Sequence, residues 1–142
     1  MACAAVREPK ASRSNRGFTI IGVIITTLLV SILAGIALPS YQKHVRSAAR
    51  AGAEALMQEN AIYMERYFTT NGTYVGATLP NTVSPKTGAS RYTLSFSAGP
   101  TDTLYTLQAV PDTRQTPDPC KTLTLTNTGV KGASGWTAAA CW

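Results

Sequence analysis

The chain has 142 residues, a formal net charge of +6 and three cysteines. This length leaves room for one small domain. Much of the positive charge lies near the amino end, where Arg7, Lys10, Arg13 and Arg16 are opposed only by Glu8. The rest of the chain is mildly basic, so net charge alone gives weak support for a nucleic-acid partner.

An apolar stretch without charge, Phe18 to Leu38, follows this basic preface. As a helix rising about 1.5 Å per residue it would reach about 30 Å, the thickness of a bilayer core. Basic residues beside an apolar segment tend to stay in the cytoplasm. The sequence therefore predicts a single membrane span with the carboxyl-terminal part outside.

The small residue Gly17 precedes the apolar stretch, whereas an ordinary secretory signal has its small-residue cleavage site after the apolar core. Cleavage after Gly17 would remove a leader of residues 1–17 and leave Phe18 as the new amino terminus. Glycine suits this position because no side chain obstructs a protease. A signal anchor that is never cut is the alternative, and spacing alone does not decide between them.

The sequence after Pro39 is amphipathic, with apolar residues at mostly three- and four-residue steps. The predicted buried stripe is Val45, Ala49, Ala53, Leu56, Asn60, Tyr63 and Tyr67, while Arg46, Arg50, Glu54, Glu59 and Glu65 fall largely elsewhere. We predict one helix from about Phe18 to Tyr67, with an apolar part over 18–38 and an amphipathic part over 39–70. Proline removes an amide donor, so a bend is expected between Gly35 and Pro39.

The remainder, residues 71–142, is predicted to form a small β head. Asn71-Gly72 favours a turn that ends the helix, and three runs with a period of two follow, Arg91–Ala98, Thr103–Val110 and Lys121–Asn127. Turn residues separate them, so an antiparallel meander is expected, with an exposed loop over Pro111–Pro119.

One face of this meander is apolar and would be lined by Tyr92, Leu94, Phe96, Tyr105, Leu107, Ala109, Leu123 and Leu125. Leu104 and Val110 point to the other face. A sheet with one apolar face must bury it, and the amphipathic helix is the obvious partner. The predicted fold class is therefore α+β, a long helix packed on a small antiparallel sheet.

Two cysteines, Cys120 and Cys141, lie in the part predicted outside the cytoplasm, and Cys3 lies in the preface. Cysteines in an oxidising compartment favour one disulfide, with two free thiols as the alternative. Closing a loop of about twenty residues would contribute about 3 kcal/mol in the chain-entropy model.

Catalysis is not indicated by the sequence. His44 is the only histidine, and no nucleophile or pair of acids is visibly organised around it. Asp102, Asp112 and Asp118 lie in or beside turns, which explains them more simply than metal binding does. We expect neither an enzyme nor a metal or cofactor site.

Three segments of the chain resemble the type IV pilins, and most closely the PilE-like pilins. They are "RGFTIIGVIITTLLVSILAGIALPSYQKHVRSA", "ERYFTTNGTY" and "CKTLTLTNTGVKGASGWTAAACW". The resemblance implies that a prepilin peptidase cuts after Gly17 and methylates the amine of Phe18. It also implies that assembly machinery extracts the subunit from the inner membrane, where its head is periplasmic, into an extracellular pilus.

In that family the apolar helices pack as the core of the fibre, so Phe18, Gly22 and Pro39 are the assembly positions. Cys120 and Cys141 would bound the family's disulfide region, which often serves contacts. The family usually has glutamate at the fifth mature residue, understood to pair with the amino terminus of a neighbouring subunit. Here that residue is Gly22, which cannot form the pair; a minor subunit or an impaired pilin would explain the departure.

The resemblance implies a structural subunit, most simply a minor pilin, that supports adhesion, twitching motility or DNA uptake through contacts with other pilins. One alternative is a DNA-binding uptake pilin, with phosphates bound by Lys86, Arg91, Arg114, Lys121 and Lys131. Three aspartates oppose these five cations in the head, so solvated surface charge is the simpler interpretation. A second alternative is a pseudopilin of a type II secretion system, which shares the leader and the helix.

Overall fold

The structure is a computed structural model and describes residues 19–142. The predicted leader, the cleavage position Gly17 and the methylation position Phe18 lie outside the described residues. The chain divides into two compact units, Met1–Leu38 and Pro39–Trp142. One helix, α1 (Ile20–Asn71), contributes to both units and contains Pro39.

The first unit, as far as it is described, is the apolar part of α1. Its large aliphatic side chains are half or more exposed, except Val23 at 43%. By length and composition this helix could cross a membrane. Thr26, Thr27 and Ser31 are the polar residues after the first turn, and their hydroxyls donate to backbone carbonyls one turn earlier, for example Ser31 to Thr27 at 2.8 Å. These internal bonds make the hydroxyls compatible with an apolar surrounding.

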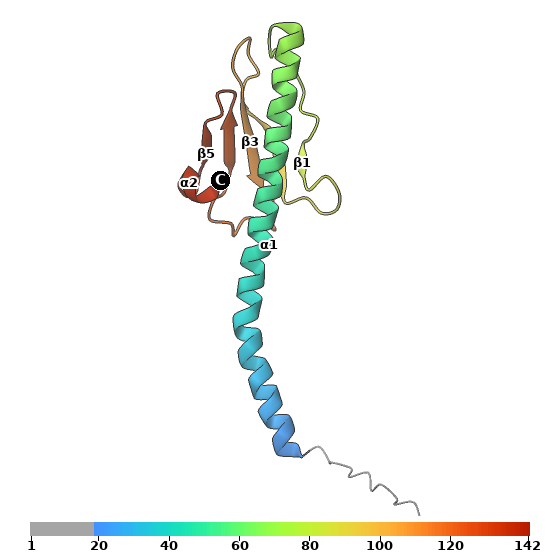
Figure 1. Cartoon of the computed structure of the whole chain (residues 1–142), viewed down its shortest axis with the longest axis vertical. Helices are drawn as coiled ribbons and strands as arrows, with labels where there is room; N and C mark the ends of the chain where they lie inside the picture. Colours follow the sequence, from blue (N-terminus) through green and yellow to red (C-terminus); the bar gives the residue numbers. More distant parts are fainter. Residues whose placement is uncertain (1–18) are drawn as a thin grey trace, which may run out of the picture. The chain divides into compact units, whose positions relative to one another are not determined.

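The second unit combines the rest of α1 with a five-stranded antiparallel sheet in the order β1-β2-β3-β4-β5 (Figure 1). The strands are β1 (Val83–Ser84), β2 (Tyr92–Ala98), β3 (Thr106–Pro111), β4 (Leu123–Thr126) and β5 (Lys131–Ala133), followed by the short helix α2 (Ala138–Cys141). The predicted meander is confirmed as β2, β3 and β4. The two edge strands and α2 were not predicted, because each has four residues or fewer.

The core of the second unit lies between α1 and the sheet (Figure 1). Seven of the eight predicted sheet residues are buried, and Phe96 is half-buried; Leu104 and Val110 are exposed, as predicted. Register places Leu94 opposite Ala109 and Leu107 opposite Leu125, so apolar side chains of three strands share one face. The α+β prediction is confirmed.

The buried stripe of α1 differs from the predicted one. Ala53, Leu56 and Asn60 are buried as predicted, but Met57 and Met64 complete the stripe, and Tyr63 is 37% exposed. Asn60 is an unusual core residue because its side chain is polar. Its burial is compensated by two hydrogen bonds with the backbone of Asn81, at 2.8 and 3.1 Å. These bonds fix the loop after α1 against the helix.

The end of α1 is as predicted. Gly72 adopts a positive φ of 70°, and its amide donates to the carbonyl of Phe68 at 2.8 Å. Cys120 and Cys141 form a disulfide, so that prediction is confirmed. The bond ties the start of β4 to α2 and closes the last part of the chain onto the sheet.

Candidate functional site

Basic side chains gather at one end of the second unit, where α1 lies beside the start of β2 and the connection from β3 to β4. A hollow of about 410 Å³ is lined by Tyr41, Gln42, Val45 and Arg46 of α1 together with Arg91 and Arg114. Backbone hydrogen bonds fix Arg91, whose amide donates to Ser84 and whose carbonyl accepts from Asp112. Three arginines therefore line one hollow.

A second hollow, of about 530 Å³, shares Arg46 with the first. Its other lining residues are Lys43, Ser47, Arg50, Pro117, Asp118, Pro119 and Trp136. Trp136 is 62% exposed, which is unusual for a large aromatic side chain. Lys43, Arg46 and Arg50 follow one another at three- and four-residue steps, so the helix presents them on one face.

Arg50 differs from its neighbours because a buried carboxylate neutralises it. Its guanidinium donates to both oxygens of Asp118 at 2.9 and 3.1 Å, and Asp118 is fully buried. The Tyr92 hydroxyl, the Gln115 amide and the Cys120 backbone N–H also donate to Asp118. Burial alone would raise the pKa of Asp118, but these hydrogen bonds and the charge of Arg50 outweigh it and lower the pKa below 3.8.

This network corrects two predictions. The segment Pro111–Pro119 was expected to be an exposed loop, yet Gln115 and Asp118 are buried, and Gln115 also donates to the carbonyl of Arg46. Arg50 was placed away from the buried stripe, but it points to Asp118. Asp118 therefore does more than form a turn: it anchors the β3–β4 connection to α1.

Four cations at this end remain available, and we call Lys43, Arg46, Arg91 and Arg114 the basic cluster. Within residues 19–142, the salt bridges involve Arg50 and Lys86 but none of these four. The Asp112 carboxylate is close enough to Arg114 to feel its charge, and it also accepts hydrogen bonds from Thr113 and Ser90. The cluster is thus an anion-attracting surface with little internal neutralisation.

The five residues predicted to contact phosphate do not form one stripe. Arg91 and Arg114 come together with Arg46, but Lys86 pairs with Glu59 at 2.9 Å. Lys121 donates to the carbonyl of Thr116, and the ammonium of Lys131 lies 4.9 Å from the ring centre of Trp142. Three further residues, Lys43, Arg46 and Trp136, were not predicted from sequence to contact phosphate, although the helical spacing of the first two was a usable signal.

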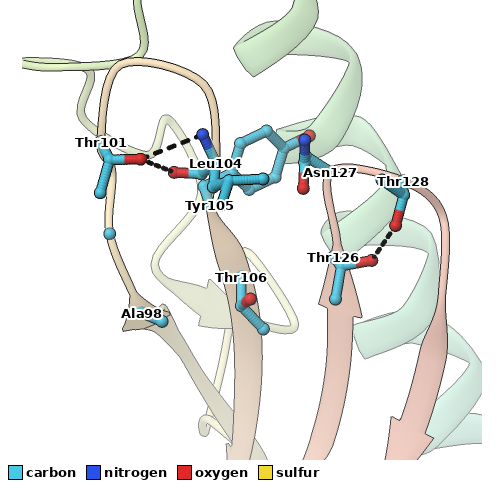
Figure 2. Close-up of a pocket in the computed structure, with 9 residues that line it drawn as sticks. Ala98, Thr101, Leu104, Tyr105, Thr106, Thr126, Asn127 and Thr128 are labelled. Carbon is cyan, nitrogen blue, oxygen red and sulfur yellow. Dashed lines mark hydrogen bonds between the residues drawn. The ribbon is translucent and has the colours of Figure 1, made fainter.

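A third hollow, at the other end of the unit, is neutral. Figure 2 shows it between the β2–β3 and β4–β5 connections, with Thr101, Thr126, Asn127 and Thr128 around it. The Thr101 hydroxyl bonds to the backbone of Leu104, and the hydroxyls of Thr126 and Thr128 bond to each other. No side chain that lines it is charged, so it has no cation to pair with a phosphate.

Comparison with known proteins explains the combination of helix, sheet and disulfide. Residues 39–124, more than half of the chain, match the family described as type IV minor pilin ComP, DNA uptake sequence receptor. The chain belongs to this family of type IV minor pilins. It is thus a subunit of the type IV pilus, and both its family and its fold are those of structural pilins.

Two solved pilins are similar to this member of the ComP family. The non-core minor pilin PilV of Neisseria meningitidis is 26% identical, with a TM-score of 0.52 over 66% of this chain and 90% of the other. A type IV pilin from Shewanella oneidensis is 28% identical, also with a TM-score of 0.52, over 68% of this chain and 97% of the other. Comparison with curated proteins gives no significant match.

Among the described residues there is no group of three or more histidine, cysteine, aspartate or glutamate side chains that could hold a metal ion. The features that remain for function are the apolar helix, the disulfide-bounded region and the basic cluster. The ComP family match covers residues 39–124, which include all four residues of the basic cluster, and its description directs attention to that cluster.

Proposed function

We propose that this pilus subunit binds DNA through the basic cluster and serves DNA uptake. The observation that carries the proposal is the convergence of Arg46, Arg91 and Arg114 on one hollow, with no salt bridge to any of the three among residues 19–142. The description of the matched family, a DNA uptake sequence receptor, supports it. Guanidinium groups bind phosphate diesters with paired N–H donors, and Lys43 adds a further point charge.

The phosphate contacts would supply affinity without reading the base sequence. A duplex held by about four cations releases a similar number of counterions, so binding should weaken steeply as salt increases. The neutral hollow at the other end lacks such groups and is not part of this proposal.

Charge reversal tests the proposal. In the full chain, Arg91→Glu with Arg114→Glu should weaken binding of a labelled duplex at least about tenfold and reduce the salt slope by about two. Fluorescence anisotropy at several salt concentrations measures both quantities. Lys121→Glu with Lys131→Glu is the matched control. It makes the same change in net charge at two lysines outside the basic cluster, whose ammonium groups contact Thr116 and Trp142, and should weaken binding less.

Equal weakening by the two pairs would mean that DNA responds to net charge rather than to this surface. No measurable binding by the unmodified chain would overturn the proposal. A loss of DNA binding confined to the arginine pair would support the proposal. It would also mean that the DNA site is the basic cluster and not the stripe of five residues predicted from sequence.

We further propose that the subunit matures as its resemblance to PilE-like pilins implies. A prepilin peptidase would cut after Gly17 and methylate Phe18, and pilus machinery would then move the subunit from the inner membrane into the fibre, with its head periplasmic beforehand. The apolar part of α1, none of which is buried, supports this route, because such a surface needs either lipid or other helices around it.

Intact-mass and amino-terminal analysis of membrane and sheared-fibre fractions tests this route. A chain that begins at methylated Phe18 in the fibre fraction is the expected result. An uncut chain that begins at Met1 in both fractions would instead identify a signal anchor.

A further inference from the structure

The basic cluster lies close, along the chain, to the membrane-spanning part of α1. Lys43 lies five positions after Leu38, the last residue of the apolar stretch, and Arg46 lies eight positions after it. Along a helix these separations are about 7.5 and 12 Å. The polar layer of a bilayer is about 5–7 Å thick on each side of the hydrocarbon core, and lysine and arginine side chains reach several ångströms back toward it.

Two exposed aromatic side chains accompany these cations. Tyr41, which lines the first hollow, is 69% exposed, and Trp136, which lines the second, is 62% exposed. Tyrosine and tryptophan concentrate at membrane interfaces, because one side of the ring is apolar and the other carries a polar group. The same end of the second unit therefore presents cations and interfacial aromatics together.

Arg91 and Arg114 extend the surface beyond the helix. They lie far from Lys43 in sequence, yet the first hollow brings them to Arg46, which the second hollow brings to Lys43. A helix that merely continued out of a membrane would offer only its own cations. Here the fold adds two more, so the surface can meet several headgroups at once.

We propose that, while the subunit resides in the membrane, the basic cluster binds the phosphodiester headgroups of anionic phospholipids, with Tyr41 and Trp136 at the level of the headgroups. This inference rests on membrane residence and not on DNA binding. Its consequence is that the lipid holds the head at the membrane surface and covers the arginines until the subunit leaves for the fibre.

Trp136 provides a direct reporter, because the chain has two tryptophans and Trp142→Phe leaves Trp136 alone. The full chain with this substitution would be placed in nanodiscs of phosphatidylcholine, with or without phosphatidylglycerol, each containing a phosphatidylcholine with a headgroup nitroxide. We expect strong quenching of Trp136 that requires phosphatidylglycerol and is lost at high salt.

Arg91→Gln with Arg114→Gln should lower the ratio of docked to undocked heads, measured by quenching at a fixed phosphatidylglycerol fraction, at least about tenfold, since each cation strengthens binding to an anionic surface about fivefold. Lys43→Gln, at an exposed helical position where folding is not at risk, should lower this ratio about fivefold. Lys86→Gln with Lys121→Gln removes the same charge as the arginine pair outside the cluster and should leave the ratio unchanged.

Equal quenching with and without phosphatidylglycerol, or equal effects of the cluster and control variants, would overturn the proposal. Inorganic phosphate added to phosphatidylcholine nanodiscs should not reproduce the effect; if it does, the site binds free phosphate and the lipid proposal fails. If duplex DNA perturbs Trp136 but phosphatidylglycerol does not, the surface is a DNA site alone. Failure of DNA binding to detergent-solubilised protein would leave the quenching result unaffected, so the two proposals fail separately.

Discussion

The two parts of α1 are both rich in apolar residues but differ in where those residues find partners. From Ile20 to Leu38 the large side chains are exposed, whereas Ala53, Met57, Asn60 and Met64 are fully buried. The second part packs on its own sheet. The first part is long and apolar enough to cross a membrane. One helix thus combines a segment that builds the core of the head with a segment whose apolar side chains stay exposed.

The largest expected effects come from placing a charge in each part. Met57→Asp would bury an unpaired carboxylate in the core and should lower the stability of the head by more than about 4 kcal/mol. Leu29→Asp should leave the melting temperature of the head unchanged but disfavour membrane insertion by about 3 kcal/mol. Circular dichroism melting in detergent and carbonate extraction of membranes measure the two properties.

If the two parts of α1 have separate roles, Met57→Asp should change only the stability of the head and Leu29→Asp only membrane insertion. Leu29→Asn, which is polar but uncharged, should give a smaller loss of insertion and serves as the control. If Leu29→Asp destabilised the head as strongly as Met57→Asp does, the two parts of α1 would not be independent.

A smaller effect is expected where α1 holds the β3–β4 connection by charge rather than by apolar packing. Asp118→Asn leaves Arg50 without its buried partner and should cost about 2–4 kcal/mol at neutral pH. The pKa of Asp118 is lower in the folded than in the unfolded chain, so its ionised form stabilises the fold above about pH 4, and this contribution is lost as the pH falls further.

Urea unfolding at neutral and acidic pH measures this contribution. The difference between the unmodified chain and Asp118→Asn should shrink on acidification. Asp102→Asn, the same substitution at an exposed aspartate, should have little effect at either pH. A difference that stayed constant with pH would mean that the ionisation of Asp118 does not carry the stability.

Sequence periodicity predicted the parts of the fold that have strong local signals. It correctly predicted the helix through the apolar stretch, the three longer strands with their buried face, and the end of the helix at Asn71-Gly72. Strands β1 and β5 were missed, because two or three residues carry no period. Met57 and Met64 were missed as core residues, because several apolar positions on this helix compete for one stripe.

The candidate site was less predictable, because it is formed by long-range packing. Arg91 and Arg114 were named from sequence, but nothing local to them indicates that Arg46 lies beside them. Asp118 is buried against Arg50 and Tyr92, which lie 68 and 26 positions before it in the sequence. A polar segment rich in proline and aspartate is predicted to be a loop, and only the fold shows that part of it is inside.

The smallest expected effect on the head comes from Gly22, in the exposed part of α1. A Cβ at this position would meet only the Thr19 hydroxyl oxygen, at 3.3 Å, so a longer side chain can be placed with little strain. Gly22→Glu would supply the carboxylate that the resemblance to PilE-like pilins implies at this position, where it would be available to pair with the amino terminus of a neighbouring subunit. Gly22→Gln is the matched control, since it has the same shape without the charge.

We expect Gly22→Glu to raise the fraction of subunits in sheared fibres about fivefold, because a charge pair in an apolar fibre core contributes at least about 1 kcal/mol. Quantitative immunoblotting of fibre and membrane fractions measures this ratio. Gly22→Gln should stay near the unmodified level, since an amide cannot replace the charge. If both variants incorporate equally, or Glu lowers incorporation, then the subunit has its place in the pilus without this pairing, and its exposed apolar helix packs there by shape alone.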